Sequence, residues 1–263
     1  MKVFDIIVST MNERIYDTLT NFKKYVSCNV GLIVVHQISD DKCYSDINLE
    51  NVTYIKSRSL GLPSSRNLGL LVSNADYVIP TDDDIKFVDN FEDSLLAIVA
   101  KYPDSDGFTM KVATDSNISN DYKSYKNYDF AHTRRSLLQV SSVELVLKRN
   151  RLIAEDVLWD LRFGLGARYP GGLEVVFLQN AWKKGIKLRF VNEYLCIHPD
   201  ESSGKTFSKD SIALRAKIFK RVFGHMAILF GAAFYVRKRN FFRSNGINFW
   251  SFLKIYIKNL KLK

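Results

Sequence analysis

Short apolar runs alternate with helix-like runs along the first 113 residues, and this alternation limits the fold more than any other feature of the sequence. The apolar runs have the length of strands and stand at residues 3–9, 30–37, 51–57, 75–81 and 106–113. The runs between them predict helices at residues 14–25, 62–74 and 90–102. Strands joined by helices pair in parallel with right-handed crossovers. The sequence therefore predicts an α/β fold with a parallel sheet.

The second half of the chain is less regular. Residues 114–136 are polar and rich in Tyr, and they show no clear periodicity. We expect them to form a long excursion, which is either an ordinary surface loop or a functional lid or binding loop. A strand at 145–150, a helix at 173–185 closed by Gly185 and a strand at 186–192 are predicted to follow.

Cysteine usage and hydropathy restrict the setting of the protein. The three cysteines, Cys28, Cys43 and Cys196, are scattered without metal-type spacing, which fits a reducing compartment better than a disulfide framework. Asp5 interrupts the apolar N-terminus, so we expect a first strand there and not a signal peptide. No stretch is expected to reach the roughly 20 apolar residues of a membrane-spanning helix.

Charge divides the chain into two unequal parts. The formal net charge is +10, yet residues 205–263 hold 14 Lys and Arg against one acid, so residues 1–204 are mildly acidic. In the basic tail the cations alternate with Phe, Trp, Tyr and Leu at helical spacing, which is typical of amphipathic helices in a membrane interface. Core helices packed on the body, or a homo-oligomer interface, are the alternatives. Nucleic-acid binding is not expected, because no motif for it occurs.

Three adjacent carboxylates, Asp82, Asp83 and Asp84, follow the predicted strand at 75–81. In an open α/β sheet, ligands bind beyond the carboxyl ends of the strands. Carboxylates gathered there suit a hard divalent cation such as Mn²⁺ or Mg²⁺, whose other ligands are waters and substrate phosphates. The alternative is a solvated turn in which an Asp caps a helix.

Several segments together resemble the family-2-type glycosyltransferases with the GT-A fold. The segments "STMNER" (9–14), "GLPSSRNLGL" (61–70) and "YVIPTDDDI" (77–85) resemble the nucleotide-binding half of that family. The stretch at 163–191 resembles the acceptor half of bacterial polysaccharide members. The resemblance covers roughly residues 3–200 and implies a Rossmann-like half with a mixed central sheet.

The resemblance also implies a division into domains. A GT-A domain would span residues 1–204, with a nucleotide-binding half at 1–113 and an acceptor half at 114–204. Outside the resemblance, the charge and the helical spacing of the tail predict that residues 205–263 form a basic amphipathic helical region that associates with a membrane.

The donor site implied by the resemblance draws on four segments. Ser9, Thr10 and Asn12 would face the nucleotide. Arg66 would contact the nucleotide or diphosphate, or form a helix-start salt bridge instead. The ribose would be held by Asp82 and Asp83, and the metal would be ligated by Asp84. Members of the family commonly read the base with an Asp after the second strand, for which this chain offers Gln37, Asp40 or Asp41.

The catalytic base implied by the resemblance is Glu174 in "PGGLEVV". An inverting transfer needs a base to take the proton of the acceptor hydroxyl. The family has a pair of acids at this point, and Leu173 replaces the first of them. Glu174 could instead only complement a helix dipole. Asp156 and Asp160 are the fallback bases.

Two further residues carry roles with open alternatives. Trp159 would line the acceptor pocket, or it is a core aromatic residue. His198 would be a second metal ligand, or it is a structural histidine.

Taken together, the resemblance implies a metal-dependent inverting glycosyltransferase of the hexosyltransferase type. It would move a sugar from a nucleotide-sugar, such as a UDP-sugar, to a lipid-linked glycan at the cytoplasmic face of the bacterial inner membrane. Capsule or lipopolysaccharide assembly is the implied setting. The replacement by Leu173 keeps a second hypothesis open, a non-catalytic sugar-nucleotide-binding module on the membrane. A nucleic-acid-binding protein is a distant third.

Overall fold

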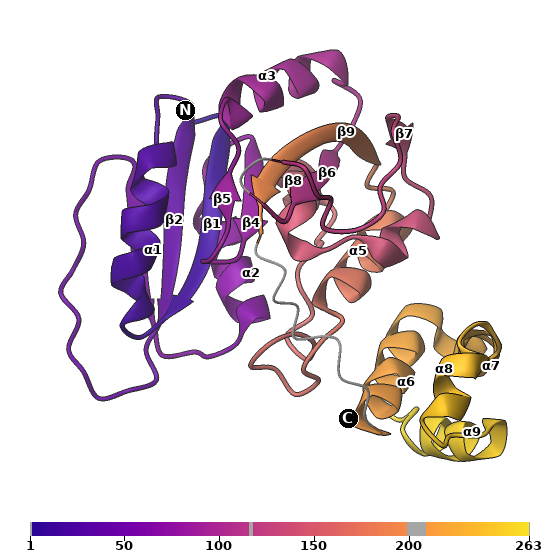
Figure 1. The fold of residues 1–263 in the computed structure, drawn as a ribbon. Helices are drawn as coiled ribbons and strands as arrows, with labels where there is room; N and C mark the ends of the chain where they lie inside the picture. Colours follow the sequence, from indigo (N-terminus) through magenta and orange to yellow (C-terminus); the bar gives the residue numbers. More distant parts are fainter. Residues whose placement is uncertain (1, 116–117, 199–208, 263) are drawn as a thin grey trace.

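The structure is a computed structural model that describes residues 2–115, 118–198 and 209–262 (Figure 1). These residues form a nine-stranded mixed sheet in the order β3-β2-β1-β4-β8-β6-β9-β5, with β7 paired to β9. The strands are β1 Phe4–Met11, β2 Val30–Gln37, β3 Val52–Ser57, β4 Tyr77–Thr81, β5 Lys86–Phe87, β6 Gly107–Ala113, β7 Phe130–Ala131, β8 Leu145–Lys148 and β9 Leu188–Ile197.

Helices connect and cover these strands. In the sheet domain the helices are α1 Arg14–Phe22, α2 Leu62–Val72, α3 Phe91–Lys101, α4 Arg149–Ala154 and α5 Leu173–Lys183, with 3₁₀ turns η1 Lys23–Tyr25, η2 Ser136–Gln139 and η3 Ser142–Glu144. The C-terminal helices are α6 Lys209–Phe223, α7 Ala227–Arg237, α8 Arg239–Ser244 and α9 Phe249–Lys258, with the 3₁₀ turn η4 Gly224–Met226 between α6 and α7.

The sheet is mixed because β8 in its middle runs against both neighbours, and because the short strands β5 and β7 each pair antiparallel with β9. Strands β1 to β4 pair in parallel, as the alternation predicts. Strand β8 is antiparallel to both β4 and β6, so the parallel pairing predicted from the alternation does not extend across the whole sheet. The mixed sheet implied by the family resemblance is confirmed. Since β6 and β9 again run parallel to each other, the carboxyl ends of β1, β2, β4, β6 and β9 meet at one edge.

Two apolar layers enclose the sheet. Successive residues of a strand point to opposite faces, and β1 places Ile6 and Val8 in one core cluster and Ile7 in the other. The first cluster includes side chains of α1 and α3, and the second includes side chains of α2 and α5. Burial on both faces explains why these strands read as continuous apolar runs.

The C-terminal helices form a compact group with a core of their own (Figure 1). Its buried residues include Tyr235, Phe242, Phe252 and Tyr256. A further cluster joins α6 to the sheet domain through contacts of Ile218 and Val222 with residues that include Phe163, Tyr169 and Val176. Many aromatic residues of the basic tail are therefore core residues, which corresponds to the alternative of helices packed on the body. The predicted domain boundary at 204 lies outside the described residues.

One stretch within the described part of the chain, Asp210–Arg237, qualifies by length and composition as a candidate membrane span. The sequence analysis expected no stretch of this kind, so that expectation is not met. The stretch comprises α6, η4 and α7, and 28% of its apolar window is buried inside the structure. A single stretch of this kind is weak evidence for spanning, and the packing of α6 on the sheet domain counts against it.

Candidate functional site

A cavity of about 720 Å³ lies at the edge where the parallel strands end. Seven of the residues singled out from the sequence line it: Ser9, Thr10, Gln37, Asp82, Asp83, Asp84 and His198. The wall also includes residues that the sequence analysis did not single out, among them Arg14, Leu60, Gly61, Tyr122 and Leu165. Of these, Arg14 is the last residue of "STMNER", so its place in that motif could have identified it as a residue of the site.

The three adjacent carboxylates do not share one counter-charge. Asp82 accepts a hydrogen bond from Arg66 Nη2 at 3.0 Å, and Asp83 accepts one from Arg14 Nη2 at 2.5 Å. Asp84 Oδ1 lies 3.6 Å from His198 Nε2. Burial raises the pKa of Asp83, while Arg14 acts in the opposite direction. Each carboxylate therefore has a cationic or ionisable partner of its own, and this arrangement allows three acids in a row.

Arg66 is the centre of a buried bridge between the two halves of the domain. Its side chain is 0% exposed, and its Nη1 donates to Glu174 Oε1 at 2.7 Å while Nη2 donates to Asp82. Arg66 does not line the cavity, and it forms the salt bridges that were the alternative to the predicted nucleotide contact. The nucleotide contact itself stays a prediction. The partner of Arg66, Glu174, lies 108 residues further along the chain, which no local pattern reveals.

The neighbouring Asn67 ties the same helix to the acceptor half. Its side chain donates to Trp159 O and accepts from Trp159 N, both at 2.8 Å. The Trp159 ring is 1% exposed and stacks on Phe177 with ring centroids 4.2 Å apart. Packing against a sugar requires an exposed ring, so the burial of Trp159 favours the core alternative over the predicted acceptor contact.

Asp84 and His198 are the residues of this site that could hold a metal ion. Their side chains are 50% and 13% exposed, and both line the cavity. Among the described residues no three His, Cys, Asp or Glu side chains converge on one point. A carboxylate and an imidazole nonetheless fit Mn²⁺ or Mg²⁺, because such ions commonly complete their shell with waters and phosphate oxygens. The loop "DESSGK" after His198, at 200–205, lies outside the described residues.

The residues proposed to read the base shape the loops around the cavity. Gln37 Oε1 accepts from Gly61 N at 2.6 Å, at the start of α2. Asn12, which was predicted to face the nucleotide and not to read the base, does not line the cavity, and its side chain pairs with Ser39 at 2.9 Å. The Asp40 carboxylate accepts from the Tyr44 hydroxyl at 2.9 Å. Asp40 and the exposed Asp41 also lie outside the cavity lining, so Gln37 is the residue of this group that reaches it.

A close backbone approach closes one wall of the cavity. Leu62 N donates to Leu165 O at 2.9 Å, and a Cβ added to Gly166 would lie 2.8 Å from Gly61 Cα. Gly166 also has φ +71°, a conformation that favours glycine. The loop before α5 therefore contacts the start of α2 because Gly61 and Gly166, which meet there, both lack a side chain.

Glu174 is the second residue of α5, and the helix begins at Leu173 directly after two glycines with positive φ, Gly171 and Gly172. The Glu174 side chain is 20% exposed. Leu173, which replaces the family's first acid, is 3% exposed and packs in the core cluster with Phe177. An acid at 173 would therefore be buried among apolar side chains, so the core explains the leucine.

The two fallback bases lie in different surroundings. Asp156 is exposed, has φ +50° and does not line the cavity. Asp160 accepts hydrogen bonds from Arg162 and from Arg221 of α6, at 2.8 and 2.7 Å. These two guanidinium groups outweigh the effect of burial and hold the pKa of Asp160 well below its ordinary value. A carboxylate held ionised in this way is poorly suited to accept a proton, and its contact with Arg221 ties the C-terminal helices to the sheet domain.

Asp160→Asn is expected to lower the free energy of unfolding by about 1–3 kcal/mol, because two guanidinium groups lose their charged partner. Asp156→Asn, at an exposed position, is the matched control and should change it little. The pKa of Asp160 in the folded protein lies below the ordinary 3.8, so its ion pairs stabilise the folded state fully above that pH. This stabilisation is lost as the pH falls through the folded-state pKa. Denaturant unfolding should therefore show a stability difference at pH 7 that shrinks progressively below about pH 4. Equal stabilities of the two variants at pH 7 would contradict this role.

Comparison with known proteins extends these observations. No family model and no curated protein matches the chain. Among solved structures, residues 1–349 of S. aureus TarS match with a TM-score of 0.61 and 15% identity, over 94% of this chain and 74% of that one. The same TarS segment in complex with UDP-GlcNAc matches with a TM-score of 0.65 and 15% identity, over 99% of this chain and 82% of that one. The chain therefore has the GT-A glycosyltransferase fold of TarS.

Proposed function

We propose that the protein is a metal-dependent, inverting glycosyltransferase that takes its sugar from a UDP-sugar. One observation carries the proposal: within a GT-A fold, Asp82, Asp83 and Asp84 line a cavity at the carboxyl ends of the parallel strands, and Arg66 connects the first of them to Glu174. Ligands of open α/β sheets bind at this edge. The TarS structures in complex with UDP and UDP-GlcNAc support a UDP-sugar as the donor.

The residues that would hold the metal ion are Asp84 and His198. With waters and phosphate oxygens completing the shell, this carboxylate and imidazole would suit Mn²⁺ or Mg²⁺. When bound, such an ion stabilises negative charge on the departing diphosphate. On the protein side, Ser9, Thr10 and Gln37 would orient the nucleotide, since they line the same cavity.

Glu174 would take the proton of the acceptor hydroxyl as that oxygen attacks the anomeric carbon. Its Oε1 is held by Arg66, and no donor binds Oε2 among the described residues. Because the carboxylate is partly exposed while Arg66 is fully buried, an acceptor can approach it from the solvent side. Arg66 acts as a positioning residue that fixes this base relative to Asp82.

A second candidate function is a sugar-nucleotide-binding module without catalysis. The buried Leu173 at the place of the family's first acid favours it. Both candidates bind a nucleoside diphosphate, so a thermal-shift series with UDP, GDP, CDP and ADP, each with and without Mn²⁺, tests what they share. We expect the largest stabilisation with UDP and Mn²⁺ together. No shift with any nucleotide would contradict both candidates, and turnover of a donor distinguishes them.

The acceptor we propose is a lipid-linked glycan at the cytoplasmic face of the bacterial inner membrane, in capsule or lipopolysaccharide assembly. The charge of the tail supports a location at an anionic surface, since residues 205–263 hold 14 Lys and Arg against one acid. Several large apolar side chains of the C-terminal helices are also exposed, including Leu229 at 65%, Val236 at 61% and Trp250 at 74%. Exposed apolar residues beside cations suit the interface of a bilayer.

Trp250→Glu combined with Leu229→Glu is expected to weaken binding to anionic vesicles strongly without disturbing the fold, because both side chains are exposed. Sedimentation with phosphatidylglycerol-containing vesicles measures this. The control is Leu71→Glu, at an exposed position of α2 in the sheet domain, which should bind like the unmodified protein. Deletion of the whole tail is a poorer test, because it would uncover Phe163 and Val176. Equal sedimentation of the double variant and the control would contradict the membrane proposal.

A further inference from the structure

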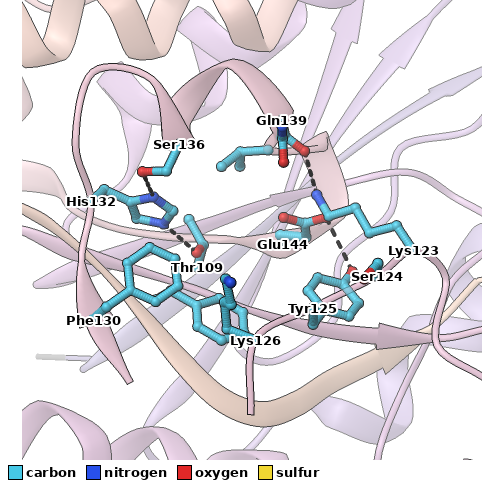
Figure 2. A pocket seen from close by; sticks show the side chains of 12 residues that line it. Thr109, Lys123, Ser124, Tyr125, Lys126, Phe130, His132, Ser136, Gln139 and Glu144 are labelled. Carbon is cyan, nitrogen blue, oxygen red and sulfur yellow. Dashed lines mark hydrogen bonds and ion pairs between the residues drawn. The ribbon is translucent and has the colours of Figure 1, made fainter. Parts of the chain in front are cut away.

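A second pocket of about 350 Å³ is lined in large part by the polar excursion (Figure 2). Seven lining residues belong to the excursion at 114–136: Lys123, Ser124, Tyr125, Lys126, Phe130, His132 and Ser136. The other five are Thr109 of β6, Gln139 of η2, Val140, Glu144 of η3 and Phe190 of β9. No residue lines both this pocket and the 720-Å³ cavity. Its volume lies in the range of small-molecule sites.

One part of the pocket consists of buried polar groups. His132 Nε2 lies 2.7 Å from Thr109 Oγ1, and His132 Nδ1 lies 2.9 Å from Ser136 Oγ. Burial lowers the pKa of His132 to about 4, so the imidazole is neutral at physiological pH. The carboxylate of Glu144, which is 1% exposed, forms an ion pair with Lys123 and accepts from the Tyr125 hydroxyl at 3.2 Å. The lining therefore offers hydroxyl, imidazole, ammonium and carboxylate groups in a small space (Figure 2).

Another part of the pocket is aromatic. Phe130 and Phe190 contact each other with ring centroids 5.1 Å apart, and Tyr125 stacks on Phe190 with centroids 5.9 Å apart. All three rings belong to the lining. Hydroxyl groups need donors and acceptors, whereas the C–H face of a sugar ring needs an apolar surface. Polar groups beside aromatic rings in one small pocket match both requirements.

The pocket is connected to the donor site through η3. Ser142 Oγ donates to Asp82 Oδ2 at 3.3 Å, and Glu144 stands two residues later on the same turn. The excursion joins the two sites as well, because Tyr122 lines the donor cavity and Lys123 lines the pocket. A ligand in the pocket would therefore contact η3 and the excursion, two segments that also contribute to the donor site, without occupying the donor cavity.

We propose that this pocket binds a sugar ring of the acceptor glycan that lies next to the ring receiving the new sugar. The proposal rests on the proposed glycosyltransferase function and adds to it a location and a ligand class. It also assigns the excursion at 114–136 the role of a binding loop, which is one of the two hypotheses from the sequence. A transferase with such a subsite distinguishes acceptors by a ring that does not react.

A blocking substitution tests this proposal. Ser124 is exposed and lines the pocket, so Ser124→Trp should fill the pocket without disturbing the core. Asn127→Trp is the matched control, because Asn127 is exposed on the same segment and does not line the pocket. Saturation-transfer NMR with the methyl glycosides of glucose, galactose, mannose and N-acetylglucosamine measures ring binding to the full chain. Titration of UDP in Mn²⁺ is run in parallel on all three proteins.

We expect at least one glycoside to bind to the unmodified protein and to Asn127→Trp, and to lose its signal with Ser124→Trp, while UDP binding stays the same in all three. Glu144→Gln, which alters the buried polar groups without adding volume, should also weaken the glycoside signal. If UDP binds but no glycoside does, or if Ser124→Trp retains the signal, the sugar subsite is wrong and the proposed function stands. If UDP does not bind to the unmodified protein, the proposed function fails, and the assignment of the pocket to an acceptor fails with it.

Discussion

Asp84→Ala is expected to abolish the metal-dependent part of UDP binding and to leave the fold intact. The side chain is half exposed and supplies one of the two protein groups that could hold the ion, so its loss removes the ion and not the core. Burial raises the pKa of Asp83, and the neighbouring carboxylates of Asp84 and Asp82 add to this effect. The thermal stability of the variant without nucleotide should therefore stay the same or rise slightly.

Calorimetric titration of UDP in the presence of Mn²⁺ and of EDTA measures this effect. Asp89→Ala is the matched control, since Asp89 is exposed five residues along the chain and does not line the cavity. The control should keep the full difference between Mn²⁺ and EDTA. Unchanged metal dependence in Asp84→Ala would show that the ion is held elsewhere.

Glu174→Gln is expected to reduce turnover by roughly 10²–10⁴, the usual contribution of a general base. The amide keeps the shape of the side chain and can still accept from Arg66, but it cannot take the acceptor's proton. Donor affinity should change little, because Glu174 does not line the donor cavity. The free energy of unfolding should fall by about 1–2 kcal/mol, since the fully buried Arg66 loses one of two charged partners.

Asp156→Asn is the control for this prediction, because Asp156 is exposed and outside the cavity lining. It should leave both turnover and stability near those of the unmodified protein. Near-normal turnover of Glu174→Gln, together with the expected loss of stability, would reduce Glu174 to a structural partner of Arg66. Loss of transfer in Asp156→Asn with an active Glu174→Gln would place the base at Asp156.

Most of the sheet could be predicted from the sequence, because burial on both faces produces apolar runs of strand length. Strand β2 was predicted at its observed bounds, Val30–Gln37. The direction of β8 could not be predicted, since it depends on the path of the preceding excursion, which has no periodicity. Helix α4, Arg149–Ala154, was missed because six residues are too few to show a helical period. The strands β5 and β7 were not predicted, because two residues are too few to show the alternation of a strand.

The residues of the site that follow the ends of strands can be predicted from the sequence. Contacts between side chains far apart in the sequence cannot. The position of Asp82 to Asp84 after a buried strand was enough to place them at the cavity. The bridge from Arg66 to Glu174 joins two helices far apart in sequence, so only the fold reveals it. Likewise, the spacing of aromatic residues in the tail is the same for a helical core as for a membrane interface. Only the structure reveals that Phe252 and Tyr256 pack inside the C-terminal group of helices.

The release of UDP from UDP-sugars by the purified full chain tests the central claim most directly. UDP-glucose, UDP-galactose and UDP-N-acetylglucosamine would each be incubated with the protein in Mn²⁺ and in EDTA, and free UDP would be quantified over time. The proposed function predicts that at least one donor is turned over in Mn²⁺, that EDTA stops the reaction, and that Asp84→Ala and Glu174→Gln are both strongly impaired. Metal-dependent UDP binding without turnover of any donor, even when glycan acceptors are added, would contradict the enzymatic claim and favour the non-catalytic module.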